Sequence, residues 1–289
     1  MPKNLRIGPW SKLASPTLAL VTSYLLYHRP TGDHLDTQVS SYPAVYSTYW
    51  WYNTIGVIYM TGVVAWITIY RTKGALLTFT LLSWKMNALR HGINAAAPFL
   101  YDGHLLLTLN HILRFPALVS ASITFSVWNF VLFPYVYSSA LDTKEKKDHF
   151  LKWNFNVRMV QQHVCNIIYA VMNTVVAANL TGGNGAPPLF DNDDLWYGLV
   201  CTVSYGMFYT LILDRIGVHV YPVFSPRSNF VVVTWGMLFA LHYALYQFWN
   251  LVMVHHWDIL RLEVLIGLNF GIMFACAIVF WYISGRSKP

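Results

Sequence analysis

Eight apolar segments, most of them long enough to cross a membrane as a helix, dominate this chain of 289 residues. A helix needs roughly 17–25 apolar residues to cross the hydrocarbon core of a bilayer. With 56% hydrophobic and only 11% charged residues, the chain is too apolar for a soluble domain of this length. We therefore predict an all-α fold, a polytopic transmembrane bundle of about seven or eight helices, forming a single integral membrane domain over residues 1–289. The predicted spans are 13–27, 47–70, 75–99, 115–139, 153–180, 196–213, 229–253 and 259–284.

The distribution of Lys and Arg predicts how these helices are oriented. Cytoplasmic loops collect Lys and Arg, and with a cytoplasmic N-terminus eight spans place most basic residues on one side, including the lysines between 144 and 152. We expect both termini to be cytoplasmic, the protein to reside in the endoplasmic reticulum, and segment 141–150 to be a solvated turn. The net charge of +7 reflects this topology, and no pattern predicts nucleic-acid binding.

Polar side chains recur at helical spacing inside the span 153–180. They follow one another at intervals that place them on one broad face of a helix. A polar face in a membrane-crossing helix turns to protein or to a wet cavity, not to lipid. Its residues are Asn154, Gln162, Asn166, Tyr169 and Asn173.

Polar stripes on two further spans, 75–99 and 229–253, are expected to face the same place. We predict that these stripes converge on one intramembrane pocket open to the bilayer, where a lipophilic substrate binds. Interhelical hydrogen bonding or a transport path would explain the same stripes. With the first stripe, the candidate substrate-binding residues are Asn154, Gln162, Asn166, Tyr169, Asn173, Asn87, His91, Trp84, Tyr221, His242 and Tyr246.

Two carboxylates beside apolar runs are candidates for acid chemistry. Asp214 directly follows the span 196–213 and leads toward His219, and Glu263 lies in the first turns of the last span. A buried carboxyl group can stay protonated and deliver a proton, while aromatic rings stabilise a carbocation without supplying a nucleophile. Asp214, Glu263 and His219 are therefore candidate catalytic residues. The structural alternatives are an ion pair of Asp214 with Arg215 or a neighbouring helix, and a helix-start role for Glu263.

The sequence predicts no metal and no other cofactor. The His-rich boxes of di-iron lipid enzymes are absent. The acidic run 191–194 resembles a magnesium-binding box, but it stands in a Gly- and Pro-rich loop without a second acidic box. The three cysteines lie in apolar spans, where we expect them to serve packing. The expected partners are the lipid bilayer and a small lipophilic substrate, with no obligate protein partner.

Three stretches carry a resemblance to a known family. WNFNVRMVQQHVCNIIYAVMN, DLWYGL and LILDRIGVHVYPVFSPRS resemble the integral-membrane terpene cyclases of fungal meroterpenoid pathways, of the ascofuranone and ascochlorin type. The resemblance implies that the protein cyclises the farnesyl or epoxyfarnesyl tail of an isoprenoid substrate by protonating an epoxide or an alkene. In this hypothesis Asp214 is the general acid, and Glu263 is its rival.

A second set of stretches is similar to another family. LLTFTLLSW, FPALVSASITFSVWNF, a helix with His163, and GVHVYPVF follow one another as in the androgen-induced family of membrane threonine hydrolases. The resemblance implies hydrolysis of fatty-acid esters, with Thr78 as nucleophile, His163 as base and Thr54 as a rival to Thr78. The cyclase is our first hypothesis, the hydrolase is the alternative, and a small-lipophile transporter or binding protein is the third.

Overall fold

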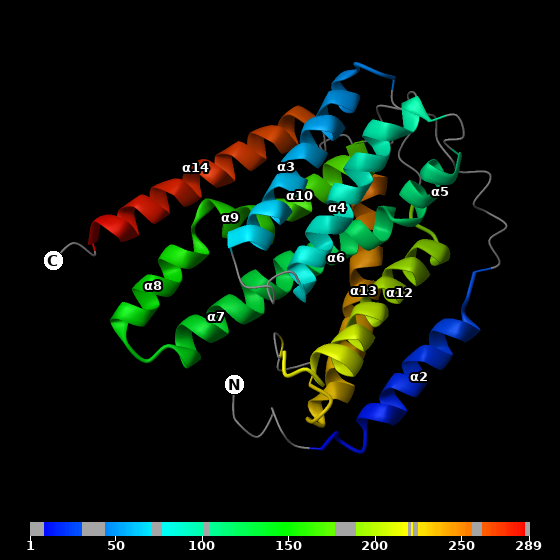
Figure 1. Cartoon of the computed structure of the whole chain (residues 1–289), viewed down its shortest axis with the longest axis vertical. Helices are drawn as coiled ribbons and strands as arrows, with labels where there is room; N and C mark the ends of the chain where they lie inside the picture. Colours follow the sequence, from blue (N-terminus) through cyan, green and yellow to red (C-terminus); the bar gives the residue numbers. More distant parts are fainter. Residues whose placement is uncertain are drawn as a thin grey trace.

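All the regular structure that the computed structural model describes is helical. The described residues are 9–30, 44–70, 77–100, 104–176, 189–218, 221, 225–255 and 262–286, and no strand occurs among them, which confirms the all-α prediction (Figure 1). The helices are α2 (Ala14–Tyr27), α3 (Thr48–Tyr70), α4 (Phe79–Ala96), α5 (His104–Ile112), α6 (Arg114–Val127), α7 (Phe133–Tyr135), α8 (Lys144–Asn154), α9 (Val157–Val160), α10 (Asn166–Val171), α12 (Asn192–Phe208), α13 (Phe230–His255) and α14 (Leu262–Arg286).

Several helices contain or continue into wider π-helical turns. A π turn closes its hydrogen bond one residue further along than an α-helical turn, and such turns are frequent at functional sites. In the described residues they are Trp128–Leu132, Val136–Ala140, Gln161–Cys165, Met172–Val176 and Tyr209–Leu213.

Within the described residues, five helices are long and apolar enough to cross a membrane, which is compatible with an integral membrane protein. The other expected spans, 13–27, 75–99 and 153–180, are helical over most of their described residues but do not meet this measure. Helix α2 has only 14 residues, and α4 carries the polar stripe. The five are Thr48–Tyr70, Leu105–Ala140, Asn192–Leu213, Phe230–Val254 and Val264–Trp281.

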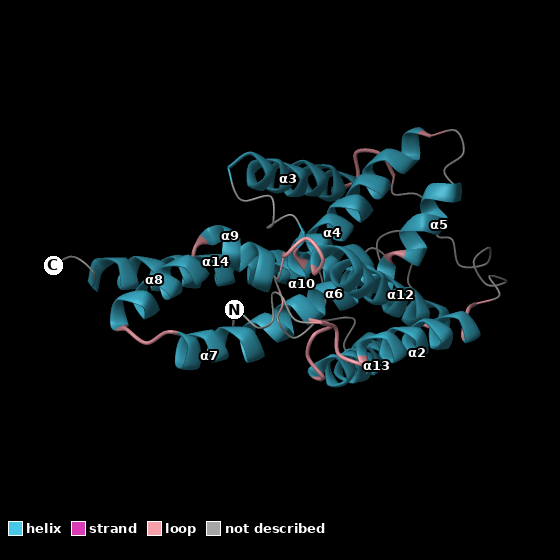
Figure 2. Cartoon of the chain, turned by 60° about the horizontal axis from the view of Figure 1, so that its bottom comes forward, coloured by secondary structure: helices cyan, strands magenta, loops and turns pink. Residues whose placement is uncertain are grey.

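Helix α6 forms the centre of the bundle. It contacts α4, α10, α12 and α13, and every residue from Arg114 to Thr124 is buried. In the apolar stretch of the span Leu105–Ala140, which contains α6, 56% of the residues are buried, whereas in that of Val264–Trp281 within α14 only 11% are. Figures 1 and 2 show α3 and α4 on one side of α6 and α12 and α13 on the other. The residues that α4 and α10 present to α6 are therefore withdrawn from the surroundings of the bundle.

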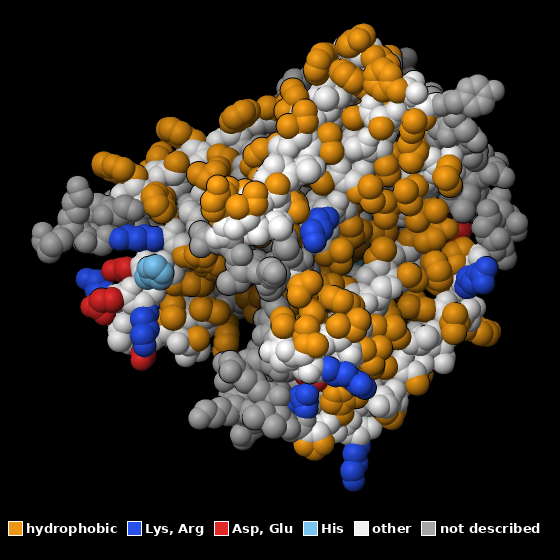
Figure 3. Space-filling model, in the orientation of Figure 1, with side chains coloured by type: hydrophobic (Ala, Val, Ile, Leu, Met, Phe, Trp, Pro, Cys, Tyr) orange, Lys and Arg blue, Asp and Glu red, His pale blue; other side chains and the backbone are white. Residues whose placement is uncertain are grey.

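The outward faces of the peripheral helices are apolar. Ile58 on α3 is 68% exposed, and Phe270 and Phe274 on α14 are each 71% exposed. On the face drawn in Figure 3, hydrophobic side chains cover most of the bundle, and charged side chains gather over α8. Contiguous apolar surface of this extent is unusual on a soluble monomer and suits contact with lipid.

The segment predicted as a solvated turn forms most of helix α8, so that prediction was wrong. The Thr143 hydroxyl caps the helix by accepting a hydrogen bond from the Lys146 amide at 3.3 Å. Its apolar side packs against aromatic rings, since Phe150 stacks on Phe133 with ring centroids 5.5 Å apart. The many lysines hid this short amphipathic pattern in the sequence.

The expected helix over 153–180 is divided at its beginning. Helix α8 ends at Asn154, and α9 begins at Val157 after Asn156, whose side chain accepts from the Met159 amide at 3.1 Å. The prediction that Asn154 shares a helix face with Gln162 and the later asparagines was therefore wrong. A local cap ended the helix, although the apolar pattern continued.

Helices α3 and α4 approach each other closely at Gly56. A Cβ atom there would lie 2.8 Å from Nδ1 of His91, which is fully buried, whereas a Cβ at Gly62 on the same helix would meet nothing within 4 Å. We predict that Gly56→Ala lowers stability by about 1–3 kcal/mol through overpacking. Gly62→Ala should instead stabilise the protein by about 0.5–1 kcal/mol through helix propensity.

Thermal unfolding of the two variants in detergent micelles would measure this difference. Equal unfolding midpoints for Gly56→Ala and Gly62→Ala would contradict the close approach of α3 to His91.

Candidate functional site

Helix α4 and the segment 157–176 are joined by a series of polar contacts that we call the polar ladder. Ser83 and Asn87 near the start of α4 bond to Asn166, and Arg90 and Asn94 near its end bond to Thr174 and Asn173, so the two run in the same direction. The ladder consists of Asn166 Nδ2 to Ser83 Oγ at 2.9 Å, Asn87 Nδ2 to Asn166 Oδ1 at 2.9 Å, Asn94 Nδ2 to Asn173 Oδ1 at 2.8 Å, and an Arg90 guanidinium bond to the Thr174 hydroxyl. All seven side chains are buried.

Helices α3 and α5 close the far end of the ladder. The Tyr49 hydroxyl donates to Asn173 Oδ1 at 3.0 Å, and Asn53 Oδ1 lies 3.0 Å from His91 Nδ1. Arg90 also donates from Nε to Asn110 Oδ1 at 3.0 Å. The structure thus brings together four predicted residues, Asn87, His91, Asn166 and Asn173. They bond directly to one another or to neighbouring helices, as interhelical hydrogen bonding requires.

Two further predicted residues, Trp84 and Tyr169, meet between the same two elements with ring centroids 5.9 Å apart, whereas Asn154, Gln162, His242 and Tyr246 make their contacts elsewhere. Asn154 accepts from Trp128, and Gln162 is buried with its Nε2 unpaired among the described residues. Trp84 donates to the Met60 carbonyl group at 3.2 Å, the Tyr169 hydroxyl donates to Gln161 at 2.7 Å, His242 contacts Thr202, and Tyr246 packs edge-on against Phe115.

The other end of the ladder brings a hydroxyl group to His163. Thr80 Oγ1 lies 3.4 Å from His163 Nε2. Thr80 is partly exposed, whereas His163 is buried. Thr78, predicted as the nucleophile, is the N-cap of α4 and accepts from the Leu81 amide at 3.2 Å. Its rival Thr54 donates to the Trp50 carbonyl group at 3.0 Å. The hydroxyl placed beside the histidine therefore belongs to Thr80.

The protonation pattern of the neutral His163 ring follows from its partners. Nδ1 lies 3.1 Å from the Met159 carbonyl oxygen, which can only accept a hydrogen bond. Nδ1 therefore carries the proton, and Nε2 presents a lone pair to Thr80. His163 lies in the π turn Gln161–Cys165. The pair has the arrangement of a hydroxyl nucleophile and its general base.

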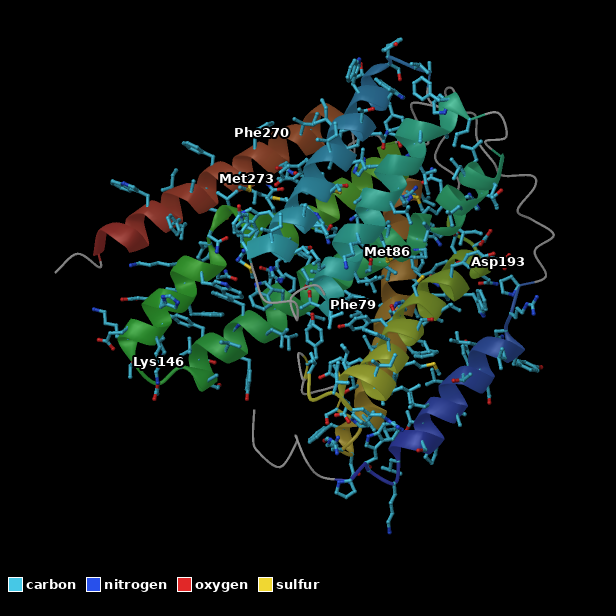
Figure 4. The ribbon with its side chains drawn as sticks, viewed as in Figure 1. Phe79, Met86, Lys146, Asp193, Phe270 and Met273 are labelled. Atoms are coloured by element: carbon cyan, nitrogen blue, oxygen red, sulfur yellow. The ribbon has the colours of Figure 1, made fainter. Side chains whose placement is uncertain are left out.

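The first turn of α4 adds hydrogen-bond donors beside Thr80. The amides of Phe79 and Thr80 have no carbonyl partner within the helix, because they belong to its first turn. The Tyr221 hydroxyl contacts the Thr80 side chain and the backbone of both residues. The Tyr221 backbone is held by Tyr209, whose hydroxyl donates to its carbonyl group at 2.7 Å. Figure 4 shows Phe79 at the start of α4 and Met86 further along it.

A second Thr and His pair lies between α12 and α13. Thr202 Oγ1 is 2.9 Å from His242 Nε2, and His242 Nδ1 is 2.7 Å from the Leu238 carbonyl oxygen. Both side chains are buried, and His242 is fully so. Thr202 stands in the interior of a helix, where the amides bond within the helix. This pair shares the chemistry of Thr80 and His163 but lacks both access and donors for an oxyanion, so it serves to hold the two helices together.

The predicted general acid, Asp214, lies in an ion pair. Asp214 is 1% exposed, and its carboxylate accepts from Arg227 Nη2 at 2.8 Å and from Trp10 Nε1 at 3.3 Å. The Arg215 guanidinium group lies over the Trp10 ring, 5.5 Å from its centroid. His219 and the side chain of Glu263 lie outside the described residues.

The acidic run 191–194 begins helix α12, so its assignment to a loop was wrong. Asp191 is the N-cap and forms a capping box with Asp194. Asp194 also pairs with Arg114, whose Nε donates at 2.8 Å, and both side chains are buried. This ion pair could not be predicted from the sequence, because its partners are 80 residues apart. The Asp-x-x-Asp spacing before an apolar run was the available signal for the cap.

Comparisons of the chain with protein-family models, with curated proteins and with solved structures find no match.

Proposed function

We propose that the protein is a membrane-embedded hydrolase of fatty-acid esters, with Thr80 as the nucleophile and His163 as the general base. The observation that carries this proposal is the position of the Thr80 hydroxyl at the lone pair of a histidine whose other nitrogen is fixed by the Met159 carbonyl group. The resemblance to the threonine hydrolases supports the reaction class, and the contact with His163 favours Thr80 over the N-cap residue Thr78 as the nucleophile.

The proposed reaction proceeds in two steps. The Thr80 oxygen attacks the ester carbonyl carbon while His163 Nε2 takes the hydroxyl proton, and collapse of the tetrahedral intermediate releases the alcohol with that proton. Water then attacks the acyl-threonine with His163 again as base and releases the fatty acid. The first-turn amides of α4 bond to the Tyr221 hydroxyl, and the oxyanion would take the place of this hydroxyl as their acceptor. The positive end of the α4 dipole adds to this stabilisation.

We also propose that the bundle crosses the endoplasmic reticulum membrane seven or eight times, with both termini in the cytoplasm. The five long apolar helices support it. The parallel course of α4 and segment 157–176 suits the third and fifth spans of an eight-span topology. The charged face of α8 suits a cytoplasmic position.

The hydrolase proposal predicts that Thr80→Ala and His163→Ala abolish ester cleavage. Removing a general base typically lowers the rate by about two to four orders of magnitude, and removing the nucleophile leaves no acyl-enzyme. Microsomes containing each variant would be offered a branched fatty-acid ester, and release of free acid would be measured. Thr80→Ser, which keeps the hydroxyl group, should retain activity.

The matched control is Thr202→Ala, which removes the hydroxyl of the other Thr and His pair and should leave turnover per folded protein intact. A fluorophosphonate probe, which phosphonylates an activated hydroxyl with loss of fluoride, would locate the nucleophile by peptide mass spectrometry. Modification of Thr78 together with activity in Thr80→Ala would move the nucleophile to Thr78. Failure to cleave any ester would count against the hydrolase and favour a transporter or binding protein.

The terpene cyclase is the second candidate function. The burial of Asp214 beside the Trp10 indole supports it, because a dry carboxyl group near an aromatic ring suits acid-initiated carbocation chemistry. The Arg227 guanidinium bonds weigh against it, since they are typical of an ionised carboxylate and not of a proton donor.

Asp214→Asn distinguishes the two functions. In the hydrolase it should lower stability, because Arg227 loses its anionic partner, while turnover per folded protein on the ester remains. In a cyclase it should abolish conversion of an epoxyfarnesyl phenol to a cyclic isomer of unchanged mass, with Glu263→Gln as the matched variant. Mass spectrometry of the products would decide, and isomerisation lost in Asp214→Asn would overturn the hydrolase proposal.

A further inference from the structure

A tryptophan ring lies over the His163 imidazole. The rings of Trp128 and His163 are stacked with centroids 4.3 Å apart and an interplanar angle of 26°. Trp128 is the first residue of the π turn that continues α6. The central helix of the bundle therefore positions the ring that contacts His163. The stack limits the imidazole to one plane, and the Nδ1 bond to Met159 fixes its direction within that plane.

The Trp128 ring is itself held by a residue of a third helix, α8. Its Nε1 donates to Asn154 Oδ1 at 2.8 Å, and Asn154, the last residue of α8, is only 9% exposed. The neighbouring Asn129 donates to the His163 backbone carbonyl group at 3.4 Å. Asn154, Trp128 and His163 therefore form a chain of contacts from the surface helix to the base.

We infer that Trp128 and Asn154 are positioning residues for the base His163, an inference that rests on the proposed ester hydrolysis. Nε2 faces Thr80 only while the imidazole keeps its present plane, and a rotation of the ring would carry the lone pair away from the hydroxyl. The indole face also stabilises the imidazolium that forms when His163 takes the proton. Neither residue needs to touch the substrate.

The test is the rate of fluorophosphonate labelling of the full chain in microsomes, measured against probe concentration and normalised to folded protein. Trp128→Leu, which removes the ring, and Asn154→Ala, which removes the acceptor, should each lower the maximal rate by roughly 10- to 100-fold, since small misplacements of reacting groups cost that much. The probe concentration at half-maximal rate should not change.

A double-mutant cycle tests whether Asn154 acts through Trp128. Trp128→Phe keeps an aromatic ring over His163 but has no donor for Asn154, so it should resemble Asn154→Ala. The double variant should then be no slower than either single variant. Thr202→Ala, which touches neither residue, should label at the wild-type rate.

The outcomes separate this inference from the proposed function. Wild-type protein that is not labelled, or labelling that survives His163→Ala, would overturn the hydrolase and this inference with it. Labelling that depends on His163 but keeps its maximal rate in Trp128→Leu and Asn154→Ala would overturn the positioning role alone. Additive effects in the double variant would remove Asn154 from the role.

Discussion

The polar ladder between α4 and segment 157–176 is the constraint on which the site depends. Amide side chains away from water lose several kcal/mol unless they are paired, about 2–7 kcal/mol by transfer measurements. Asn87, Asn94 and Asn173 find their partners only when the two helices stand in one register. A slip by one turn would break all these bonds together, so the ladder specifies the register. The separation of Thr80 from His163 at its end follows from the same alignment.

The sequence was sufficient for helices α2 and α3 and for the facing of α4 toward segment 157–176. The apolar runs 13–27 and 47–70 agree with α2 and α3 to within one residue, because hydrophobic length alone specifies such helices. The polar stripes on 75–99 and 153–180 predicted that these two helices face each other, since buried amides require partners. What periodicity cannot supply is the identity of a partner many residues away, and the ion pair of Arg114 with Asp194 shows this.

The details of the site were beyond sequence reasoning for specific physical reasons. Thr78 and Thr80 both stand at the start of α4, and only the position of His163 separates a capping hydroxyl from one beside a base. The apolar pattern places Asn154 and Gln162 on one helix. The Asn156 cap that divides them is a single local hydrogen bond, which leaves no trace in that pattern. Thr202 and His242 show that residue types alone do not make a site. An identical pair within helix interiors has neither the amides of a first helical turn beside it nor access.

The π turn at Gln161–Cys165 has a consequence for how the length of this helix can vary. A π turn is wider than an α-helical turn by one residue. Deleting one residue there would restore an ordinary α-helical turn, and the helix faces before and after it would keep nearly the same orientation, because the wider turn completes one rotation with about one extra residue. Asn166 and Asn173 would still face α4, whereas His163, which lies in the turn itself, would be displaced. A deletion in the α-helical stretch that follows would instead rotate Asn173 away from α4 by about 100°.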